Sequence, residues 1–370
     1  MIEWIDSNQK LDRALSRLQK ANVLAVDTEF IRTNTFYPEI ALIQVSDGTN
    51  CWLIDVLAVD VSDKLKNLFE NDNRTLIFHA CAEDLEVLEY ALNTRPKNIF
   101  DTQIAAGVVN LGYSLGYASL VKTLFSIELD KQQTRSNWLA RPLSQKQLNY
   151  AADDVMYLHR IYYYLSEQLE QKNRTDWFNE EWIALRATVD SRKSLMDYYM
   201  RIKGAWALSE TSLKTLRRLC NWRESIAKQK NKPRGHIIKD TVLFDIAEGL
   251  PTGMDQLAEI EGLFPGMIKR FGQSLLKQVE LAQSDGKAKA LPQPMSKADT
   301  PVLRAMRDNL IEMADKMGIP PELLFKKKEL EKILRASREE ATEWPQKYRS
   351  GWRAALVAPV LNAVLDHVDS

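Results

Sequence analysis

The stretch Val23-Leu-Ala-Val-Asp27-Thr-Glu29-Phe30 runs from apolar residues straight into two carboxylates. A short apolar run of this kind predicts a strand that is buried on both faces of a sheet. Because successive side chains of a strand alternate between faces, Asp27 and Glu29 point to one side and Thr28 to the other. Two carboxylates this close repel each other, and a divalent cation with oxygen ligands is the usual reason to keep them together. A lone Asp-x-Glu is also compatible with an ordinary strand end in solvent, so other residues must decide.

The overall composition is that of a globular protein with no excess of either charge. The 370 residues are 45% hydrophobic, and 50 Lys and Arg residues balance 50 Asp and Glu residues. The length predicts two or three domains. The cysteines Cys51, Cys81 and Cys220 form no CxxC pair, which favours a reducing compartment and no zinc site. The sequence shows no signal peptide at Met1 and no membrane span. We therefore expect a soluble, cytoplasmic protein without membrane contact, and no protein partner is evident.

Strand and helix patterns alternate over the first two hundred residues. Helices are expected over residues 7–20, with Ser7 as the cap, and over 62–70. Apolar runs at 40–45 and 51–56 flank Asp47-Gly48, which indicates a hairpin. Strands are also expected at 75–79 and 99–101, and helices from 82, from 102, at 120–125 and within 144–170. This mixture predicts an α/β domain whose mixed sheet is flanked by helices.

The pattern from about residue 204 to the end is helical, without a convincing strand. Two helical blocks, roughly 205–284 and 299–368, are separated by a polar, proline-containing stretch that is typical of a linker. We therefore expect three domains, at residues 1–203, 204–290 and 291–370.

Three further residues bring chemistry to the same edge of the expected sheet. Asp84 lies on the first helical turn after the strand that ends at His79, where sites form in open α/β sheets. Tyr150 and Asp154 are four residues apart and therefore share a helical face. Neighbouring Asp153 points elsewhere and is expected to be solvated, and Tyr150 taken alone could equally be a packing residue. Four carboxylates and a phenol suit the hydrolysis of a phosphodiester by two metal ions.

In such hydrolysis, two divalent cations about 3.5–4 Å apart clamp the attacking and leaving oxygens. Asp27 could bridge both cations. Glu29 and Asp154 would complete the site that activates water, and Asp84 would complete the other. Tyr150 would hydrogen-bond the attacking water, because a phenol with an ordinary pKa of about 10 is a better orienter than a base. The expected cofactor is a pair of Mg²⁺ or Mn²⁺ ions.

The carboxylate motifs resemble those of a known nuclease family. Their order and spacing are similar to the three exonuclease motifs of the DEDDy 3′–5′ exonucleases: Asp27-Thr-Glu29, His79-x4-Asp84 and Tyr150-x3-Asp154. The intervening stretch 129–143 closely resembles a block seen in ribonuclease D. Residues 205–284 resemble an HRDC domain. Residues 299–368 resemble, less closely, the second HRDC-like domain of bacterial ribonuclease D.

The resemblance implies an RNase H-like exonuclease domain followed by two all-α domains. It also implies an enzyme that hydrolyses RNA from the 3′ end, releases 5′ nucleotides and trims tRNA precursors and other structured small RNAs. A DNA 3′–5′ exonuclease is the alternative with the same chemistry. An inactive nucleic-acid binding scaffold is the alternative in another class. All four carboxylates and the tyrosine are present, which favours an active enzyme.

Several residues near the motifs are candidates for substrate contact, each with a structural alternative. Phe30 could stack on the terminal base or pack in the core, and the backbone near Thr28 could contact the terminal ribose. His79 could bind the 3′ nucleotide or be a satisfied histidine at a strand end. Three basic side chains on a loop before the third motif could hold phosphates or form structural ion pairs: Lys131, Arg135 and Arg141.

Basic residues gather in the first helical block. Between residues 214 and 239, nine Lys or Arg side chains are opposed by one acid, Glu224. Such a run is usually a solvated helix face, but beside a nuclease domain in a neutral chain it favours an RNA-binding patch. The basic run at residues 326–328 is followed by acids and is interpreted as solvated surface. The predicted patch consists of Arg217, Arg218, Lys228 and Lys230.

Overall fold

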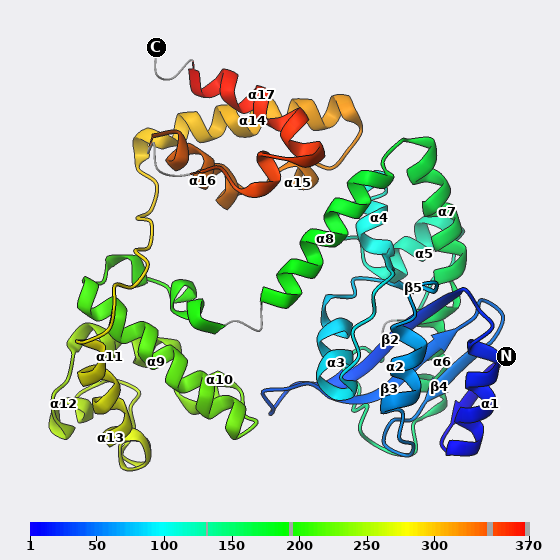
Figure 1. The fold of residues 1–370 in the computed structure, drawn as a ribbon, viewed down its shortest axis with the longest axis horizontal. Helices are drawn as coiled ribbons and strands as arrows, with labels where there is room; N and C mark the ends of the chain where they lie inside the picture. The colour runs from blue at the N-terminus through cyan, green and yellow to red at the C-terminus, as the bar shows by residue number, and fades with distance from the viewer. Residues whose placement is uncertain (131, 192–194, 339–342, 367–370) are drawn as a thin grey trace. The chain divides into compact units, whose positions relative to one another are not determined.

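The computed structural model describes residues 1–130, 132–191, 195–338 and 343–366 (Figure 1). The contacts within the chain divide it into two compact units. The second unit contains a short loop that follows the acidic strand, together with the first helical block. The first unit comprises Met1–Ile31, Ile40–Val189 and Met295–Ser370, and the second comprises Arg32–Glu39 and Asp190–Pro294.

One mixed sheet of six strands lies in the described part of the first unit, in the order β1-β4-β3-β2-β5-β6. β2 runs parallel to β5, and β5 runs parallel to β6, whereas β3 and β4 are antiparallel, as the predicted hairpin requires. The predicted mixed sheet is therefore confirmed. β1, which pairs with β4, was not predicted, because four residues are too short for a periodicity. The strands are β1 (Ile2–Ile5), β2 (Val23–Ile31), β3 (Glu39–Ser46), β4 (Cys51–Ile54), β5 (Thr75–Phe78) and β6 (Ile99–Asp101).

Helices cover both faces of the sheet, because the buried strands present apolar side chains on both sides. In β2, Leu24 and Val26 pack into one hydrophobic cluster with α1, α2 and α3, while Ala25 packs into the other with α4 to α7. The predicted cap of the first helix is confirmed, since the Ser7 hydroxyl accepts a hydrogen bond from the backbone of Lys10. The helices are α1 (Asn8–Leu18), α2 (Ser62–Phe69), α3 (Ala82–Leu92), α4 (Thr102–Val108), α5 (Tyr117–Phe125), α6 (Gln145–Met156) and α7 (Leu158–Gln171).

The second helical block packs against α8 (Thr175–Ser191), a helix that the sequence patterns did not predict. The rings of Trp177 and Trp352 stack with their centroids 4.2 Å apart, and the backbone N–H of Trp352 donates to Glu180 at 3.1 Å. The buried Arg353 forms an ion pair with the half-buried Glu181. These contacts make the block part of the first unit. Its helices are α14 (Thr300–Met317), α15 (Pro321–Leu324), α16 (Lys327–Arg338) and α17 (Gly351–Asp366).

The second unit is built around α9 (Glu210–Gln229), a helix of the first helical block. The loop of residues 32–39 packs onto this block. The Asn231 side chain accepts hydrogen bonds from the backbone N–H groups of Phe36 and Tyr37, at 3.0 and 3.1 Å. The buried Phe36 ring lies 4.7 Å below the guanidinium of Arg234. The other α-helices of this unit are α10 (Arg234–Ile237), α11 (Asp240–Gly249), α12 (Met254–Ala258) and α13 (Pro265–Ala282).

The expectation of a helical second half is confirmed, because the described residues after 204 contain no strand. Among the described helices, each is too short or too polar to cross a bilayer.

Candidate active site

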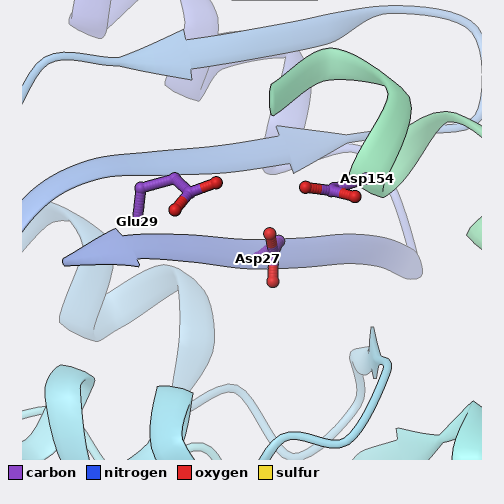
Figure 2. Close-up of side chains that lie close together, drawn as sticks. All are labelled: Asp27, Glu29 and Asp154. Atoms are coloured by element: carbon purple, nitrogen blue, oxygen red, sulfur yellow. The ribbon is translucent and has the colours of Figure 1, made fainter. Parts of the chain in front are cut away.

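Three of the four predicted carboxylates converge at β2 and α6. Figure 2 shows Asp27 and Glu29 projecting from β2 toward Asp154 on α6. One carboxylate oxygen of each residue can be chosen so that all three atoms lie within 4.8 Å of one another. The strand alternation of β2 and the inward face of α6 therefore place a set of hard oxygen ligands around one point. Such a set suits Mg²⁺ or a similar divalent cation.

Asp84 lies beside this cluster on the first turn of α3. It is buried, and its carboxylate accepts a 2.5 Å hydrogen bond from the hydroxyl of Thr28. Among the neighbouring charges, that of Asp84 contributes most to raising the pKa of Asp27. The side chain of Thr28 thus connects α3 to β2, a role that no pattern in the sequence indicated.

Burial raises the pKa of every carboxylate in the site. The pKa of Glu29 rises to about 9 and that of Asp154 to about 7, first through desolvation and then through neighbouring carboxylates. The pKa of Asp84 rises to about 6 through desolvation, although the Thr28 hydrogen bond acts in the opposite direction. Desolvation and the charges of neighbouring carboxylates raise the pKa of Asp27 well above its usual value. Four such groups need protons or cations to balance their charge, so the donor set fits divalent metal ions.

Tyr150 lies one helical turn before Asp154. Its hydroxyl is 3.3 Å from that of Thr134, and its ring packs at 5.9 Å from the ring of Trp138. As a hydrogen-bonding neighbour, it lowers the pKa of Asp154 against the effect of burial. Burial and the nearby carboxylates raise the pKa of Tyr150 above its ordinary value. The phenol therefore stays protonated and can donate or accept a hydrogen bond, as the predicted orienting role requires.

The buried Asp101 and the half-buried Tyr117 hold the backbone next to the carboxylates in place. Asp101 accepts hydrogen bonds from the backbone N–H groups of Ala80 and Cys81, and so fixes the turn that leads into α3 and Asp84. The Tyr117 hydroxyl donates to the carbonyl of Asp153 at 2.8 Å and accepts from the backbone N–H of Tyr157 at 3.3 Å. It therefore bridges the break between α6 and α7. Sequence reasoning missed both residues, although an aspartate before a helix start, as at Asp101, is a recognisable cap signal.

The whole chain is similar to proteins of one family. Residues 2–170 match the family described as 3′-5′ exonuclease, and residues 212–279 match the HRDC domain. Ribonuclease D of Pseudomonas paraeruginosa is 36% identical to the chain, over 98% of this chain and 97% of that protein. The chain belongs to the ribonuclease D family. The predicted resemblance is thereby confirmed, and with it the exonuclease domain and the first HRDC domain.

Two further relatives show the same full-length match to the ribonuclease D family. Ribonuclease D of Shewanella sp. is 30% identical, over 98% of this chain and 93% of that protein. The crystal structure of Escherichia coli RNase D, described as an exoribonuclease involved in structured RNA processing, matches with a TM-score of 0.87 at 29% identity and covers 99% of both chains. The exonuclease fold of this family implies the use of divalent metal, which the carboxylate cluster is able to bind.

The candidates for substrate contact differ in how the structure places them. Both ring nitrogens of His79 have partners at 2.9 Å, the hydroxyl of Thr102 and the carbonyl of Leu115, so a contact with the 3′ nucleotide would require an exchange of one bond. Phe30 is half-buried at the end of β2, and Arg135 is exposed on the loop before α6. Lys131 lies outside the described residues. The contacts predicted for these residues remain predictions.

Arg141 is held by several groups of the protein. Its guanidinium forms a two-point ion pair with Asp55, at 2.7 and 2.8 Å, and donates to the backbone carbonyls of Ala41 and Trp138. Asp55 itself is buried. This geometry supports the alternative that the sequence left open, a structural ion pair, over a free phosphate-binding side chain.

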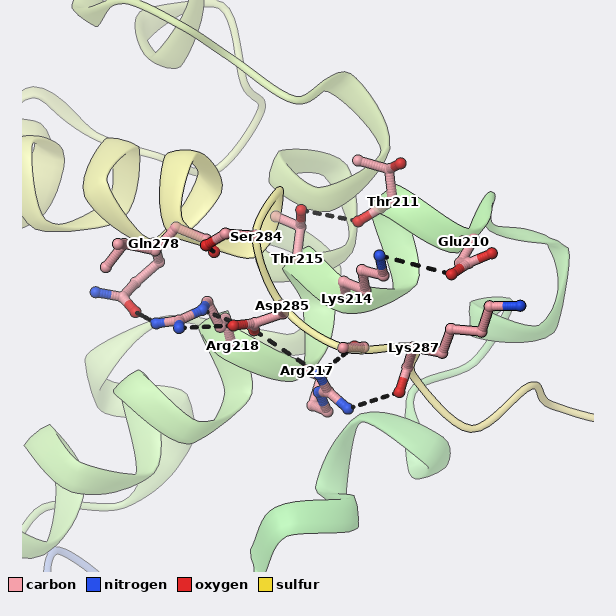
Figure 3. A network of polar contacts seen from close by, with 12 residues as sticks. Glu210, Thr211, Lys214, Thr215, Arg217, Arg218, Gln278, Ser284, Asp285 and Lys287 are labelled. Carbon is pink, nitrogen blue, oxygen red and sulfur yellow. Dashed lines mark hydrogen bonds and ion pairs between the residues drawn. The ribbon is translucent and has the colours of Figure 1, made fainter.

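The predicted basic patch is partly occupied by the chain itself. Arg218 forms a two-point ion pair with Asp285, at 2.7 and 2.8 Å, and Arg217 donates to the carbonyls of Gly286 and Lys287 (Figure 3). Both arginines therefore hold the segment that follows α13. The sequence pattern did not indicate this, because Arg218 and Asp285 are 67 residues apart. Of the other two patch residues, Lys228 is half-buried and Lys230 is exposed.

Tyr117→Phe is expected to weaken metal binding while the fold stays intact. Losing the hydroxyl removes both hydrogen bonds that hold the α6–α7 junction beside Asp154. Groups that orient metal ligands typically contribute about 10–100-fold to metal affinity. The Mg²⁺ concentration for half-maximal hydrolysis should rise on that scale, with near-normal turnover at saturation. Tyr113→Phe, at an exposed tyrosine, is the control. A normal metal dependence with only a lower melting temperature would make Tyr117 a packing residue.

The metal-free protein is expected to lose stability as pH rises. In the folded state the pKa values of Glu29, Asp154 and Asp84 are raised, whereas in the unfolded state they have their usual values of 3.8 to 4.5. The folded protein therefore binds protons at these groups more tightly than the unfolded chain does. Stability therefore falls between about pH 4 and pH 9, as the folded state must give up these protons. Melting curves in EDTA should show this fall, and Mg²⁺ should make it shallower because it favours the charged forms. A melting temperature in EDTA that rises from pH 5 to pH 8 would contradict the arrangement.

Proposed function

We propose that the chain is a metal-dependent 3′–5′ exoribonuclease that hydrolyses RNA from the 3′ end and releases 5′ nucleotides. The observation that carries the proposal is the convergence of Asp27, Glu29 and Asp154, with Asp84 alongside, in a chain of the ribonuclease D family. The same carboxylates could serve a DNA exonuclease. The full-length match to an exoribonuclease favours RNA.

The residues of the site divide the work of an in-line displacement. Two divalent ions, Mg²⁺ or Mn²⁺, would supply positive charge at the attacking and leaving oxygens. Glu29 and Asp154 would hold one ion together with Asp27, while Asp84 and Asp27 would hold the other. The protonated Tyr150 would hydrogen-bond the attacking water and fix its direction. Thr28, Asp101 and Tyr117 would keep these groups in place through the bonds described above.

The biological substrates and the organisation of the chain are part of the same proposal. We propose that the enzyme trims the 3′ ends of tRNA precursors and other structured small RNAs, in keeping with the structured RNA that the Escherichia coli relative processes. We further propose domains at residues 1–203, 204–290 and 291–370, the last a second HRDC-like domain. A reducing compartment such as the cytoplasm suits the three cysteines, which are free and buried.

A direct test uses RNA and DNA of the same sequence, labelled at the 3′ end or at the 5′ end. With Mg²⁺ or Mn²⁺, 3′-labelled RNA should release its label as a 5′ mononucleotide at once, and 5′-labelled RNA should shorten stepwise. EDTA should stop both reactions. Faster hydrolysis of DNA than RNA would favour the DNA exonuclease, and internal cleavage would refute an exonuclease of either kind.

Charge reversal at Lys228 and Lys230 tests the RNA-binding patch better than reversal of the two arginines that hold residues 285–287. We expect the variant with both lysines changed to Glu to bind a tRNA precursor more weakly. The slope of log affinity against log salt should flatten by about 0.7–0.9 for each RNA phosphate that the variant no longer neutralises. Binding over a salt series is the measurement.

A matched control for this variant is reversal of Lys269 and Lys277, exposed on α13, which changes the net charge equally. Equal losses in the two variants would show a general charge effect and no patch. Truncation after residue 203 is a poorer test, because it would also remove the Trp352 ring that covers Trp177.

A further inference from the structure

The second helical block contains a cavity of about 490 Å³. Its α14 wall includes residues 300, 303, 304 and 307, and its α16 wall includes residues 327, 330 and 331. These spacings place each set on one face of its helix, so the cavity lies between facing helical surfaces. Leu303, Phe325 and Leu330 give it an apolar floor, of which Leu330 is buried and the other two are half-buried. The volume is within the range of about 300–1,000 Å³ that is typical of small-ligand sites.

The rim of the cavity is cationic. Arg304, Arg307 and Lys327 line it, against a single acid, Glu331. Arg307 is paired with the neighbouring Asp308 at 2.7 Å. Across the part of the chain that the structure describes, neither Arg304 nor Lys327 forms an ion pair, and both are exposed. Two cations beside an apolar floor that contains an aromatic ring are thus available to an anionic ligand.

We propose that this cavity binds a nucleotide of single-stranded RNA, with the base against Phe325 and the phosphate at Arg304 and Lys327. Proteins hold unstacked RNA bases on aromatic and apolar surfaces and hold the backbone with Arg and Lys, and this cavity supplies both. The inference rests on the proposed function, because the RNA strand that enters the metal site would make its second contact at this cavity. Such a linked contact raises the affinity for long RNA and leaves that for short RNA unchanged.

The test compares two full-length double variants with the same change in charge. Arg304→Glu with Lys327→Glu alters the rim, whereas Lys316→Glu with Lys332→Glu alters exposed positions of the same two helices outside the lining. Fluorescence anisotropy in EDTA measures binding of single-stranded RNAs of about 30 and about 5 nucleotides. The rim variant should bind the long RNA about tenfold more weakly or worse, and the short RNA like wild type. The control variant should stay within about twofold of wild type.

A second variant tests the floor. Phe325→Leu keeps an apolar side chain and removes the ring, and it should weaken binding of the long RNA about fivefold or more, as expected when one base can no longer stack on an aromatic ring. RNA that contains 4-thiouridine should crosslink to the peptide that carries Phe325. Circular dichroism melting confirms that each variant is folded, and the rim variant carries the test should Phe325→Leu fail to fold.

The outcomes separate this proposal from the proposed function. Equal losses of affinity for the long RNA in the rim and control variants would overturn the proposal that the cavity binds RNA. Crosslinks confined to other peptides would also overturn it. Competition by polyglutamate as efficient as competition by unlabelled RNA would assign the rim to acidic peptides and also overturn it. Hydrolysis of the long and the short RNA in Mg²⁺ is measured in parallel. A wild type that hydrolyses neither RNA refutes the proposed function, whereas normal hydrolysis with an unaffected rim variant refutes the cavity alone.

Discussion

Asp27→Asn should reduce the rate of RNA hydrolysis on the order of 10³-fold or more. Losses of this size are typical when one residue is removed from a set of catalytic residues that act together. The substitution keeps the size of the side chain and removes its charge. Asp27 belongs to the cluster with Glu29 and Asp154, and the nearby charge of Asp84 raises its pKa, so it is the residue expected to serve both metal ions. Single-turnover hydrolysis of 3′-labelled RNA in saturating Mg²⁺ is the measurement.

The same variant should be more stable than wild type when metal is absent. Asp27, Glu29, Asp84 and Asp154 all have raised pKa values, and the charges of the other site carboxylates contribute to the raised pKa values of Asp27 and Glu29. Removal of one charge relieves this repulsion, so the melting temperature in EDTA at pH 8 should rise. A gain in stability together with a loss of activity separates a role in the site from a general effect on folding.

Asp153→Asn is the matched control, since it makes the same chemical change one residue from Asp154. The Asp153 carboxylate lies outside the three-residue cluster, and Tyr117 contacts only its backbone carbonyl. Near-normal activity is expected. A folded Asp27→Asn variant with wild-type turnover, or an equal loss in Asp153→Asn, would sink the assignment of the metal site.

Where the structure places the candidate residues as the sequence patterns predicted, local geometry is the reason. The period of two along β2 predicted that Asp27 and Glu29 share a face, and both belong to the observed cluster. The period of the helix predicted that Tyr150 lies beside Asp154, and the hydroxyl does affect the pKa of that carboxylate. Such relations depend on only a few consecutive residues, so the pattern alone carries them.

The features that the sequence did not reveal depend on contacts between distant segments. The Thr28 hydroxyl meets Asp84 across 56 positions of the chain. Tyr117 bridges a helix break that is not visible before the chain folds. The two arginines of the predicted patch looked free because their partners lie far along the chain, beyond α13. A pattern of charges predicts a patch only where no distant acid neutralises it.

Tyr150→Phe should lower turnover by about 10²–10⁴-fold while RNA binding stays nearly unchanged, because the ring remains and only the hydroxyl that orients water is lost. The raised pKa of Tyr150 keeps the phenol protonated, so the variant should lower the rate by a similar factor across neutral pH. The Mg²⁺ concentration for half-maximal activity should also stay the same. That outcome differs from Tyr117→Phe, whose defect should disappear at high Mg²⁺.

Single-turnover rates, which exclude product release, make this comparison decisive. The Tyr150 ring packs beside Trp138, so a role in packing alone predicts that Tyr150→Phe behaves like wild type. An unchanged single-turnover rate, with chemistry confirmed as the slow step, would therefore reduce Tyr150 to a packing residue. Orientation of the attacking water would then fall to another group. A large loss of rate at normal RNA affinity and normal metal dependence has no explanation in packing, because the ring that packs is still present.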